Sequence, residues 1–121
     1  MLYTFLAILL VHQGYCAYDA DEVVNLPGLK YRFDFKQYSG YLDTSLGQIH
    51  YWFVEAKEDA KNKPLLIWLN GGPGCSSMMG LFTENGPVLF NRDCDRSEED
   101  LFELNPYTWN NVNIVLLNIS F

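Results

Sequence analysis

The sequence has few of the residues that hold metal ions. Its 121 residues include three cysteines and two histidines, and one of each, Cys16 and His12, falls in an N-terminal segment that we expect to be removed. The remainder, Cys75, Cys94 and His50, is too small a set for a zinc site of the usual composition. The sequence therefore argues against a metal enzyme, and nothing in it calls for another cofactor.

Clusters of basic residues are also absent. Eight lysines and arginines stand against fifteen aspartates and glutamates, which gives a formal net charge of −7 at pH 7. A protein that binds nucleic acid or an anionic membrane surface needs a basic patch. We therefore expect neither as a partner.

No apolar run is long enough for a membrane span. The longest uncharged one, Leu2 to Val11, has about ten residues, half of what a spanning helix needs. Such a run followed by Gly14 and Cys16, at the third and first positions before a cut, predicts a signal peptide over residues 1–16 and a mature chain from Ala17. The expected localisation is the secretory pathway, lysosomal or extracellular, and the alternative is a buried N-terminal strand or helix.

Repeats and low-complexity tracts are missing too, and the apolar fraction of 49% predicts a packed core. The segments Gln37 to Leu42 and Gln48 to Glu55 are rich in aromatic and β-branched residues, with turn residues from Asp43 to Gly47 between them. This pattern predicts a β-hairpin. Both faces of the second segment are mostly apolar, which predicts a strand covered on two sides.

The rest of the chain alternates strands with a helix, an order typical of α/β folds. The elements that we expect are a buried central strand at Leu65–Leu69, a helix capped by Ser76 or Ser77 and ended at Asn85 by Gly86-Pro87, an edge segment at Pro87–Phe90, a surface excursion at Asn91–Glu103, a turn at Asn105-Pro106 and a buried strand at Val112–Leu117. We expect this sheet to be incomplete, because nothing follows its last apolar strand.

Residues 65–77 read LLIWLNGGPGCSS, an apolar run that leads into three glycines. Glycines between a strand and a helix let backbone N–H groups converge on an anion, since no Cβ is in the way. A nucleotide phosphate is one candidate, but the loop has neither the lysine of a Walker loop nor the third glycine of a dinucleotide fingerprint. A transient oxyanion, as in the glycine loop of α/β-hydrolases, is the second, and a turn made only for packing is the third.

The motif WLNGGPGCSS, followed by Glu84-Asn85-Gly86-Pro87, resembles the serine carboxypeptidase family, in its lysosomal cathepsin A type. Similar blocks occur at residues 26–29, 38–42, 50–55 and 105–110, so the resemblance extends from Glu22 to Leu117. It implies the N-terminal portion of an α/β-hydrolase fold, over residues 17–121, and an enzyme that removes C-terminal residues from peptides through an acyl-enzyme. The implied partners are peptide or protein C-termini and the remainder of the carboxypeptidase chain.

The resemblance also implies roles for single residues. The N–H of Gly72 would stabilise the oxyanion, Asn70 and the N–H of Gly71 would bind the substrate carboxylate, and Glu84 would be one of two carboxyl groups beside it. Without the resemblance, Asn70 is an ordinary turn residue and Glu84 a solvated helix end. Cys75 would form a disulfide with a distant partner, and a reactive thiol or an improvised bond to Cys94 are the alternatives.

The nucleophile of this family sits on a G-x-S-x-G elbow, and the sequence contains no such motif. His50 lies in the middle of a predicted strand, where a packed histidine fits better than a general base. We therefore expect the 121-residue chain by itself to be inactive and marginally stable. The alternative function is a truncated, non-catalytic secreted module for binding or decoy. Asn118 begins the one N-glycosylation sequon, but it lies in a run that we expect to be buried.

Overall fold

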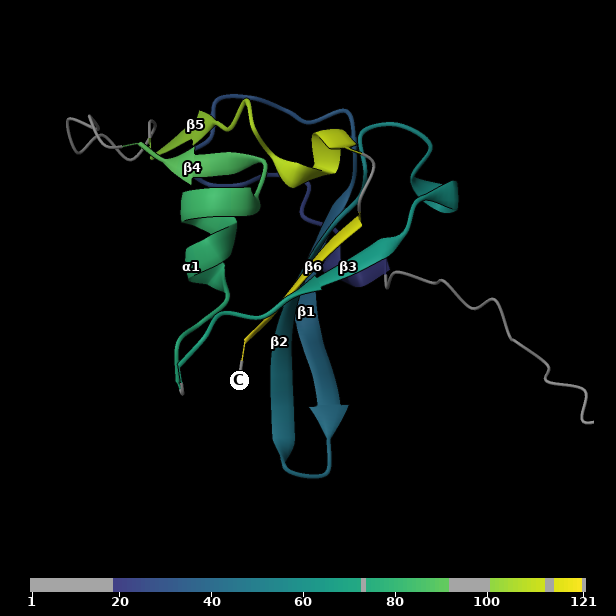
Figure 1. Ribbon diagram of the computed structural model, residues 1–121, viewed down its shortest axis with the longest axis vertical. Coiled ribbons are helices and arrows are strands. Elements are labelled where there is room, and N and C mark those ends of the chain that lie inside the picture. The colour runs from purple at the N-terminus through teal and green to yellow at the C-terminus, as the bar shows by residue number, and fades with distance from the viewer. Residues whose placement is uncertain (1–18, 73, 92–100, 113–114, 121) are drawn as a thin grey trace, which may run out of the picture.

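A mixed four-stranded sheet, a separate two-stranded sheet and one short helix make up the fold (Figure 1). The computed structural model describes residues 19–72, 74–91, 101–112 and 115–120. The elements in chain order are η1 (Asp19–Asp21), β1 (Gln37–Thr44), β2 (Gly47–Val54), η2 (Ala60–Asn62), β3 (Leu65–Trp68), α1 (Met78–Gly80), η3 (Leu81–Asn85), β4 (Val88–Phe90), β5 (Phe102–Leu104), η4 (Trp109–Val112) and β6 (Val115–Ser120). The predicted signal peptide lies outside the described residues.

The predicted β-hairpin is confirmed, with a tighter turn than expected. Strands β1 and β2 pair antiparallel from Gln37–Val54 to Thr44–Gly47, so two residues form the turn. The side chain of Thr44 closes it, because its Oγ1 donates to the Gly47 carbonyl at 2.7 Å and accepts from the Leu46 amide at 3.2 Å. Gly47 has a φ of 132°, which a residue with a Cβ adopts only under strain.

The large sheet has the strand order β1-β2-β6-β3. Strand β2 therefore has a neighbouring strand on each side within the sheet. The prediction that both of its faces are covered holds only in part, because its residues from Ile49 to Phe53 are half-buried and Val54 alone is fully buried. Strand β6 pairs antiparallel with β2 and parallel with β3. A parallel pair needs a long connection, and the segment that contains α1 provides it, as the α/β prediction requires.

Two predictions about the strands are wrong. Strand β3 lies at the edge of the sheet in the described part of the chain, not at its centre, and Leu65 and Ile67 are about half exposed. The run of five apolar residues does not distinguish an edge strand from a central one, because an apolar pattern in the sequence does not show how many strands will pair with the segment. The last strand begins at Val115 and not at Val112, because Trp109–Val112 form the 3₁₀ turn η4.

The helix begins and ends near its predicted residues, but its second half is a π-helix and not an α-helix. After α1, residues Leu81–Asn85 form a π-helical turn, which ends where the Gly86 amide donates to the Leu81 carbonyl at 3.1 Å. The end at Gly86-Pro87 confirms the prediction. Asn85 is fully buried, and neither polar atom of its side chain has a hydrogen-bond partner in the described residues.

The small sheet joins β4 to β5, antiparallel, above the helix in Figure 1. The predicted surface excursion over Asn91–Glu103 is therefore wrong at its end, because Phe102 and Glu103 belong to a strand. Phe102 is buried against Phe82 and Phe90, with ring centroids 5.3 Å from each. This aromatic packing holds strand β5 in place. The prediction of a surface excursion rested on the acidic residues of this segment and did not consider Phe102.

The helix packs against the large sheet through an aromatic core. Phe35, Val54 and Leu81 are its buried centre. Seven partly buried side chains surround them: Phe33, Trp52, Leu66, Trp68, Met78, Phe82 and Trp109. The core therefore lies between β2, β3 and the helix, and it supports the loop that leads from β3 into α1.

Candidate functional site

The glycine loop leads from the carboxyl end of β3 to the start of α1, at the end of the helix opposite the small sheet (Figure 1). Gly71, Gly72 and Gly74 are exposed, and Gly74 has a φ of 85°. This is the strand–loop–helix order that the sequence predicts for an anion site.

Backbone donors in this loop are available. The N–H groups of Gly71 and Gly72 have no acceptor in the described part of the chain. A Cβ at Gly72 would lie 2.9 Å from the Gly74 nitrogen and 3.1 Å from the Cys75 nitrogen, so the backbone folds too tightly there for a side chain. Space next to Gly71 is open. The loop can therefore present amides to a ligand that approaches Gly71.

Asn70 is the side chain of the site that the structure fixes best. Its Oδ1 accepts a hydrogen bond from the Trp68 indole at 2.7 Å, and its backbone N–H donates to Ser77 Oγ at 3.0 Å. The indole is a donor only, so the oxygen of the carboxamide must face Trp68 and the Nδ2 amide must face away. The Nδ2 group has no partner in the described residues, which leaves it as a donor for a ligand.

Of the two predicted capping residues, Ser76 and not Ser77 provides a side-chain bond to the start of the helix. The Ser77 side chain makes no capping bond, whereas the Ser76 hydroxyl satisfies the amide of the first helical residue. Ser77 is buried and accepts from Asn70, while Ser76 Oγ accepts from the Met78 amide at 3.2 Å. Ser77 therefore ties the two ends of the loop together, a support that the sequence pattern did not reveal.

Glu84 is exposed and lies in the π-helical turn that follows α1. Its carbonyl accepts from Asn105 Nδ2 at 3.0 Å, and the same Nδ2 donates to the Gly86 carbonyl at 2.8 Å. Asn105 thus holds the turn that carries Glu84, a role that the sequence showed only as a turn signal.

Cys75 is exposed and free, and Cys94 lies outside the described residues. The disulfide predicted for Cys75 therefore has no counterpart in this structure and stays a prediction. Asn118, the glycosylation candidate, sits in β6 with Trp52 and Trp68 as its neighbours in register. Backbone pairing on both sides makes it an unfavourable acceptor in the folded chain.

His50 lies in the middle of β2, as predicted. Its Nε2 is 3.0 Å from Ser39 Oγ, and its ring meets the Tyr41 ring edge-on at 5.2 Å between centroids. Both partners come from β1, so the histidine joins the two strands of the hairpin. This packing matches the structural role that the sequence favoured over a general base.

The shifted pKa values lie in the large sheet and away from the glycine loop. Burial, together with a hydrogen bond to Asp21 at 2.6 Å, raises the pKa of Tyr51 to about 12. Burial also raises the pKa of Tyr38, and the hydrogen bond to Glu22 raises the pKa of Lys36. These groups stabilise the hairpin and its N-terminal flank, and they give no candidate acid or base.

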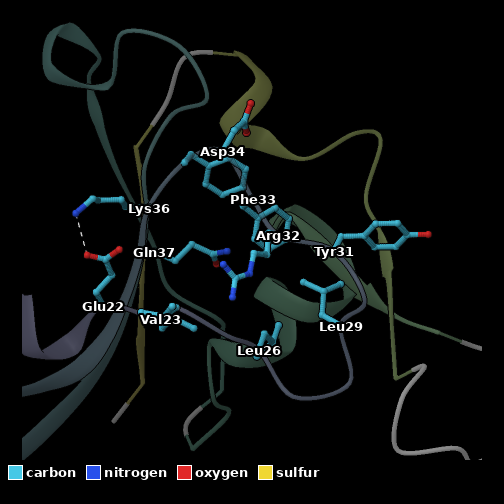
Figure 2. Close-up of a pocket in the computed structure, with 12 residues that line it drawn as sticks. Glu22, Val23, Leu26, Leu29, Tyr31, Arg32, Phe33, Asp34, Lys36 and Gln37 are labelled. Atoms are coloured by element: carbon cyan, nitrogen blue, oxygen red, sulfur yellow. Dashed lines mark hydrogen bonds and ion pairs between the residues drawn. The ribbon is translucent and has the colours of Figure 1, made fainter.

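Two of the pockets on the surface are lined by residues away from the glycine loop. One, of ≈ 250 Å³, is lined by residues between Glu22 and Gln37, with Arg32 and Gln37 pointing into it (Figure 2). The other, of ≈ 290 Å³, lies against Phe82, Leu89 and Phe90.

Among the described residues, no three histidines, cysteines or carboxylates gather where they could hold a metal ion. No helix in that same part of the chain has the length and apolarity to cross a membrane.

Two curated proteins are similar to most of this chain. Mouse lysosomal protective protein is 52% identical over 99 residues, which are 81% of this chain and 20% of that protein. The Caenorhabditis elegans protein named serine carboxypeptidase ctsa-3.1 is 43% identical over 109 residues, or 88% of this chain and 17% of that protein. This chain therefore spans about a fifth of the length of these curated relatives.

A solved structure is similar as well. The yeast prohormone-processing carboxypeptidase Kex1(delta)p superposes with a TM-score of 0.60 and 29% identity, over 79% of this chain and 22% of that one. The likeness supports the fold type of a partial α/β-hydrolase domain. The family model described as serine carboxypeptidase matches residues 27–118. With most of its residues matched, this chain belongs to the serine carboxypeptidase family.

Proposed function

We propose that this chain forms the part of a serine-type carboxypeptidase that holds the C-terminus of a peptide substrate. The enzyme removes the last residue through an acyl-enzyme. The N–H of Gly72 donates to the oxyanion that develops at the scissile carbonyl, and Asn70 and the N–H of Gly71 bind the terminal carboxylate. Hydrogen bonds of this kind strengthen as negative charge develops, which is why they accelerate acyl transfer.

One observation carries this proposal. At the carboxyl end of β3, two backbone amides without acceptors in the described residues stand beside a carboxamide whose oxygen is already engaged by Trp68. These amides and the Asn70 Nδ2 group are hydrogen-bond donors that belong to three consecutive residues. An anion with two oxygens satisfies such a set better than a neutral group.

Glu84 is proposed as one of two carboxyl groups near the bound carboxylate, the other coming from the segment with the nucleophile. Crowded carboxyl groups raise one another's pKa, so that a protonated one can donate to the substrate anion. Activity would then be favoured at acid pH. For Cys75 we propose a disulfide to a partner outside the described residues.

The serine, acid and histidine of the reaction are not offered by this sequence in a recognisable motif. We propose that the 121-residue chain does not itself hydrolyse peptides. One second candidate function is a secreted module that binds peptide C-termini without cleavage. It is favoured because the sequence has no G-x-S-x-G motif but retains the groups proposed to bind the substrate carboxylate. Turnover by the full-length gene product separates the two functions.

The proposed localisation follows from the predicted signal peptide over residues 1–16. The chain would enter the secretory pathway and reach the lysosome or the exterior. The name of the mouse relative, lysosomal protective protein, supports the first of these destinations.

Binding of labelled peptides tests the proposal. An N-acylated dipeptide with a free C-terminal carboxylate and the same dipeptide as its amide are titrated against the full-length gene product, its Asn70→Ala variant and an Asn62→Ala control. Asn62 is an exposed asparagine of η2, bonded to Asp59 and remote in sequence from the loop. Hydrogen bonds to a charged group contribute about 1.5–3 kcal/mol, or roughly ten- to a hundredfold in affinity.

We expect the parent and Asn62→Ala to prefer the acid over the amide by about that factor, and Asn70→Ala to lose the preference. Equal affinities of the parent for acid and amide would contradict the proposal.

A further inference from the structure

Gly80 lies directly beneath the pair formed by Trp68 and Asn70. It is buried at the end of α1, and a Cβ placed on it would run into Trp68 Nε1. The same Cβ would lie 2.8 Å from Asn70 Oδ1 and 3.0 Å from Trp68 Cε2. These are the two ends of the hydrogen bond that orients the Asn70 carboxamide.

The backbone gives no other reason for a glycine here. Gly80 has φ −60° and ψ −38°, ordinary helical values that any residue adopts. Alanine at such a position is favoured over glycine by about 1 kcal/mol of helix propensity. Gly71 and Gly74 differ from it, because a Cβ at either would meet nothing within 4 Å. Only the close approach to Trp68 and Asn70 explains the missing side chain.

We propose that Gly80 is a positioning residue for Asn70, which sets how far the carboxamide projects toward the substrate carboxylate. The inference rests on the proposed function of Asn70. The indole ring cannot bend away from a new methyl group, because Trp68 packs against the buried core cluster and meets the Trp109 ring edge-on at 5.3 Å between centroids. The short side chain of Asn70 therefore yields first, and the 2.7 Å hydrogen bond to Trp68 breaks or lengthens.

Gly80→Ala therefore has opposite effects on the helix and on the site. The helix itself gains propensity, whereas the carboxamide loses its fixed orientation and with it the preference for a carboxylate. We expect the affinity for the acid dipeptide to fall roughly tenfold, the size of one lost hydrogen bond to a charged group, and the affinity for the amide to stay unchanged.

A double-mutant cycle distinguishes positioning from a general loss of structure. The acid and amide affinities are measured for the parent, Gly80→Ala, Asn70→Ala and the double variant, with Met79→Ala as the matched control. Met79 is the neighbour in the same helix and is 58% exposed. If Gly80 acts through Asn70, Gly80→Ala causes no further loss of affinity for the acid dipeptide in the Asn70→Ala background, since the effects of coupled residues are not additive.

A second readout is independent of ligand binding. The indole N–H resonance of Trp68 reports its hydrogen bond, and we expect it to move toward the position of a solvent-exposed indole in Gly80→Ala and not in Met79→Ala. Should Gly80→Ala fail to fold, adding Trp68→Phe removes the indole nitrogen that the new Cβ meets, and we expect it to restore folding.

The outcomes separate the two proposals. A parent that does not distinguish acid from amide refutes the proposed function, and the indole resonance still tests Gly80. A parent that prefers the acid together with an unchanged Gly80→Ala refutes the role of Gly80 alone. Three further results would each overturn the role of Gly80. They are additive losses of affinity in the double-mutant cycle, an indole resonance that does not move in Gly80→Ala, and a misfolded Gly80→Ala variant that Trp68→Phe does not rescue.

Discussion

Asn105 illustrates how one residue far along the chain controls the helix of the site. It is buried, and its Nδ2 donates to the carbonyls of Glu84 and Gly86 while its Oδ1 accepts from the Tyr107 amide at 2.9 Å. The last carbonyls of any helix need partners. Here the donor to these carbonyls is a side chain some twenty residues further along the chain. Its hydrogen bonds hold the helix end that carries Glu84.

Asn105→Ala should destabilise the chain by about 2–6 kcal/mol, because the buried Gly86 carbonyl and the partly buried Glu84 carbonyl lose their donor at about 1–3 kcal/mol each. The free energy of unfolding, from urea denaturation followed by tryptophan fluorescence, measures this loss. Tyr107→Ala is the control, since Tyr107 is 85% exposed. A loss below 1 kcal/mol for Asn105→Ala would contradict the proposed support of the helix end.

Tyr51 makes the free energy of unfolding depend on pH in the alkaline range. Its pKa is about 12 in the folded chain, against an ordinary value of 10.0, because burial and Asp21 disfavour the phenolate. The unfolded chain therefore releases this proton first as pH rises. The contribution of Tyr51 is complete below about pH 10 and falls away between about pH 10 and 12.

The tyrosinate absorbance near 295 nm checks the titration. We expect one tyrosine to ionise about two pH units above the ordinary value of roughly 10, and that late step to vanish in Tyr51→Phe. Tyr107→Phe, at an exposed position, should leave the late step in place. A titration of the parent without a late step would show that the Asp21 contact does not form in solution.

At this scale the sequence predicted backbone features better than side-chain contacts. The freedom of Gly71 and Gly72 follows from their lack of a Cβ and needs no knowledge of the fold. Asn70 follows the end of β3 at Trp68 by two residues, and residues two apart in an extended chain share a face, a signal that could have indicated their contact. The role of Gly80 could not be predicted, because it depends on the distance between a helix and a strand.

Among the elements, the hairpin depends on its turn. Gly47 has φ 132° and open space around it, so a side chain there would meet strain and no clash. Gly47→Ala should cost about 1–3 kcal/mol, the usual range for a strained backbone. The urea midpoint measures it, and Leu46→Ser in the same turn, 98% exposed, should change little. An unchanged midpoint for Gly47→Ala would mean that the turn adopts another geometry.

The elements themselves were predictable where local patterns are strong. The hairpin and the end of the helix follow from alternation and from Gly86-Pro87. The place of β3 at an edge, the π-helical turn and strand β5 were missed, because each depends on which neighbour a segment finds. Phe102, which packs on Phe82 and Phe90, could have signalled β5 had it been weighed against its acidic surroundings.

For the whole molecule, the exposed edge at β3 has a physical consequence. Leu65, Ile67 and Leu69 are each more than half exposed, and an unpaired apolar edge favours pairing between chains. We expect the isolated 121-residue chain to self-associate with rising concentration, and Ile67→Lys to suppress this. Sedimentation velocity across a concentration series measures it. A monomeric parent at high concentration would contradict the expectation, and Thr83→Lys, at an exposed helical position, controls for the added charge.

The central claim concerns two amide hydrogens. The most direct measurement replaces the N–H of Gly72, and separately that of Gly71, with an ester oxygen in the full-length gene product and follows peptide-acid hydrolysis. The account predicts that the Gly72 ester lowers kcat by about a hundred- to a thousandfold with little change in KM, as loss of an oxyanion donor does. It predicts that the Gly71 ester instead raises KM. An unchanged kcat for the Gly72 ester would contradict the account.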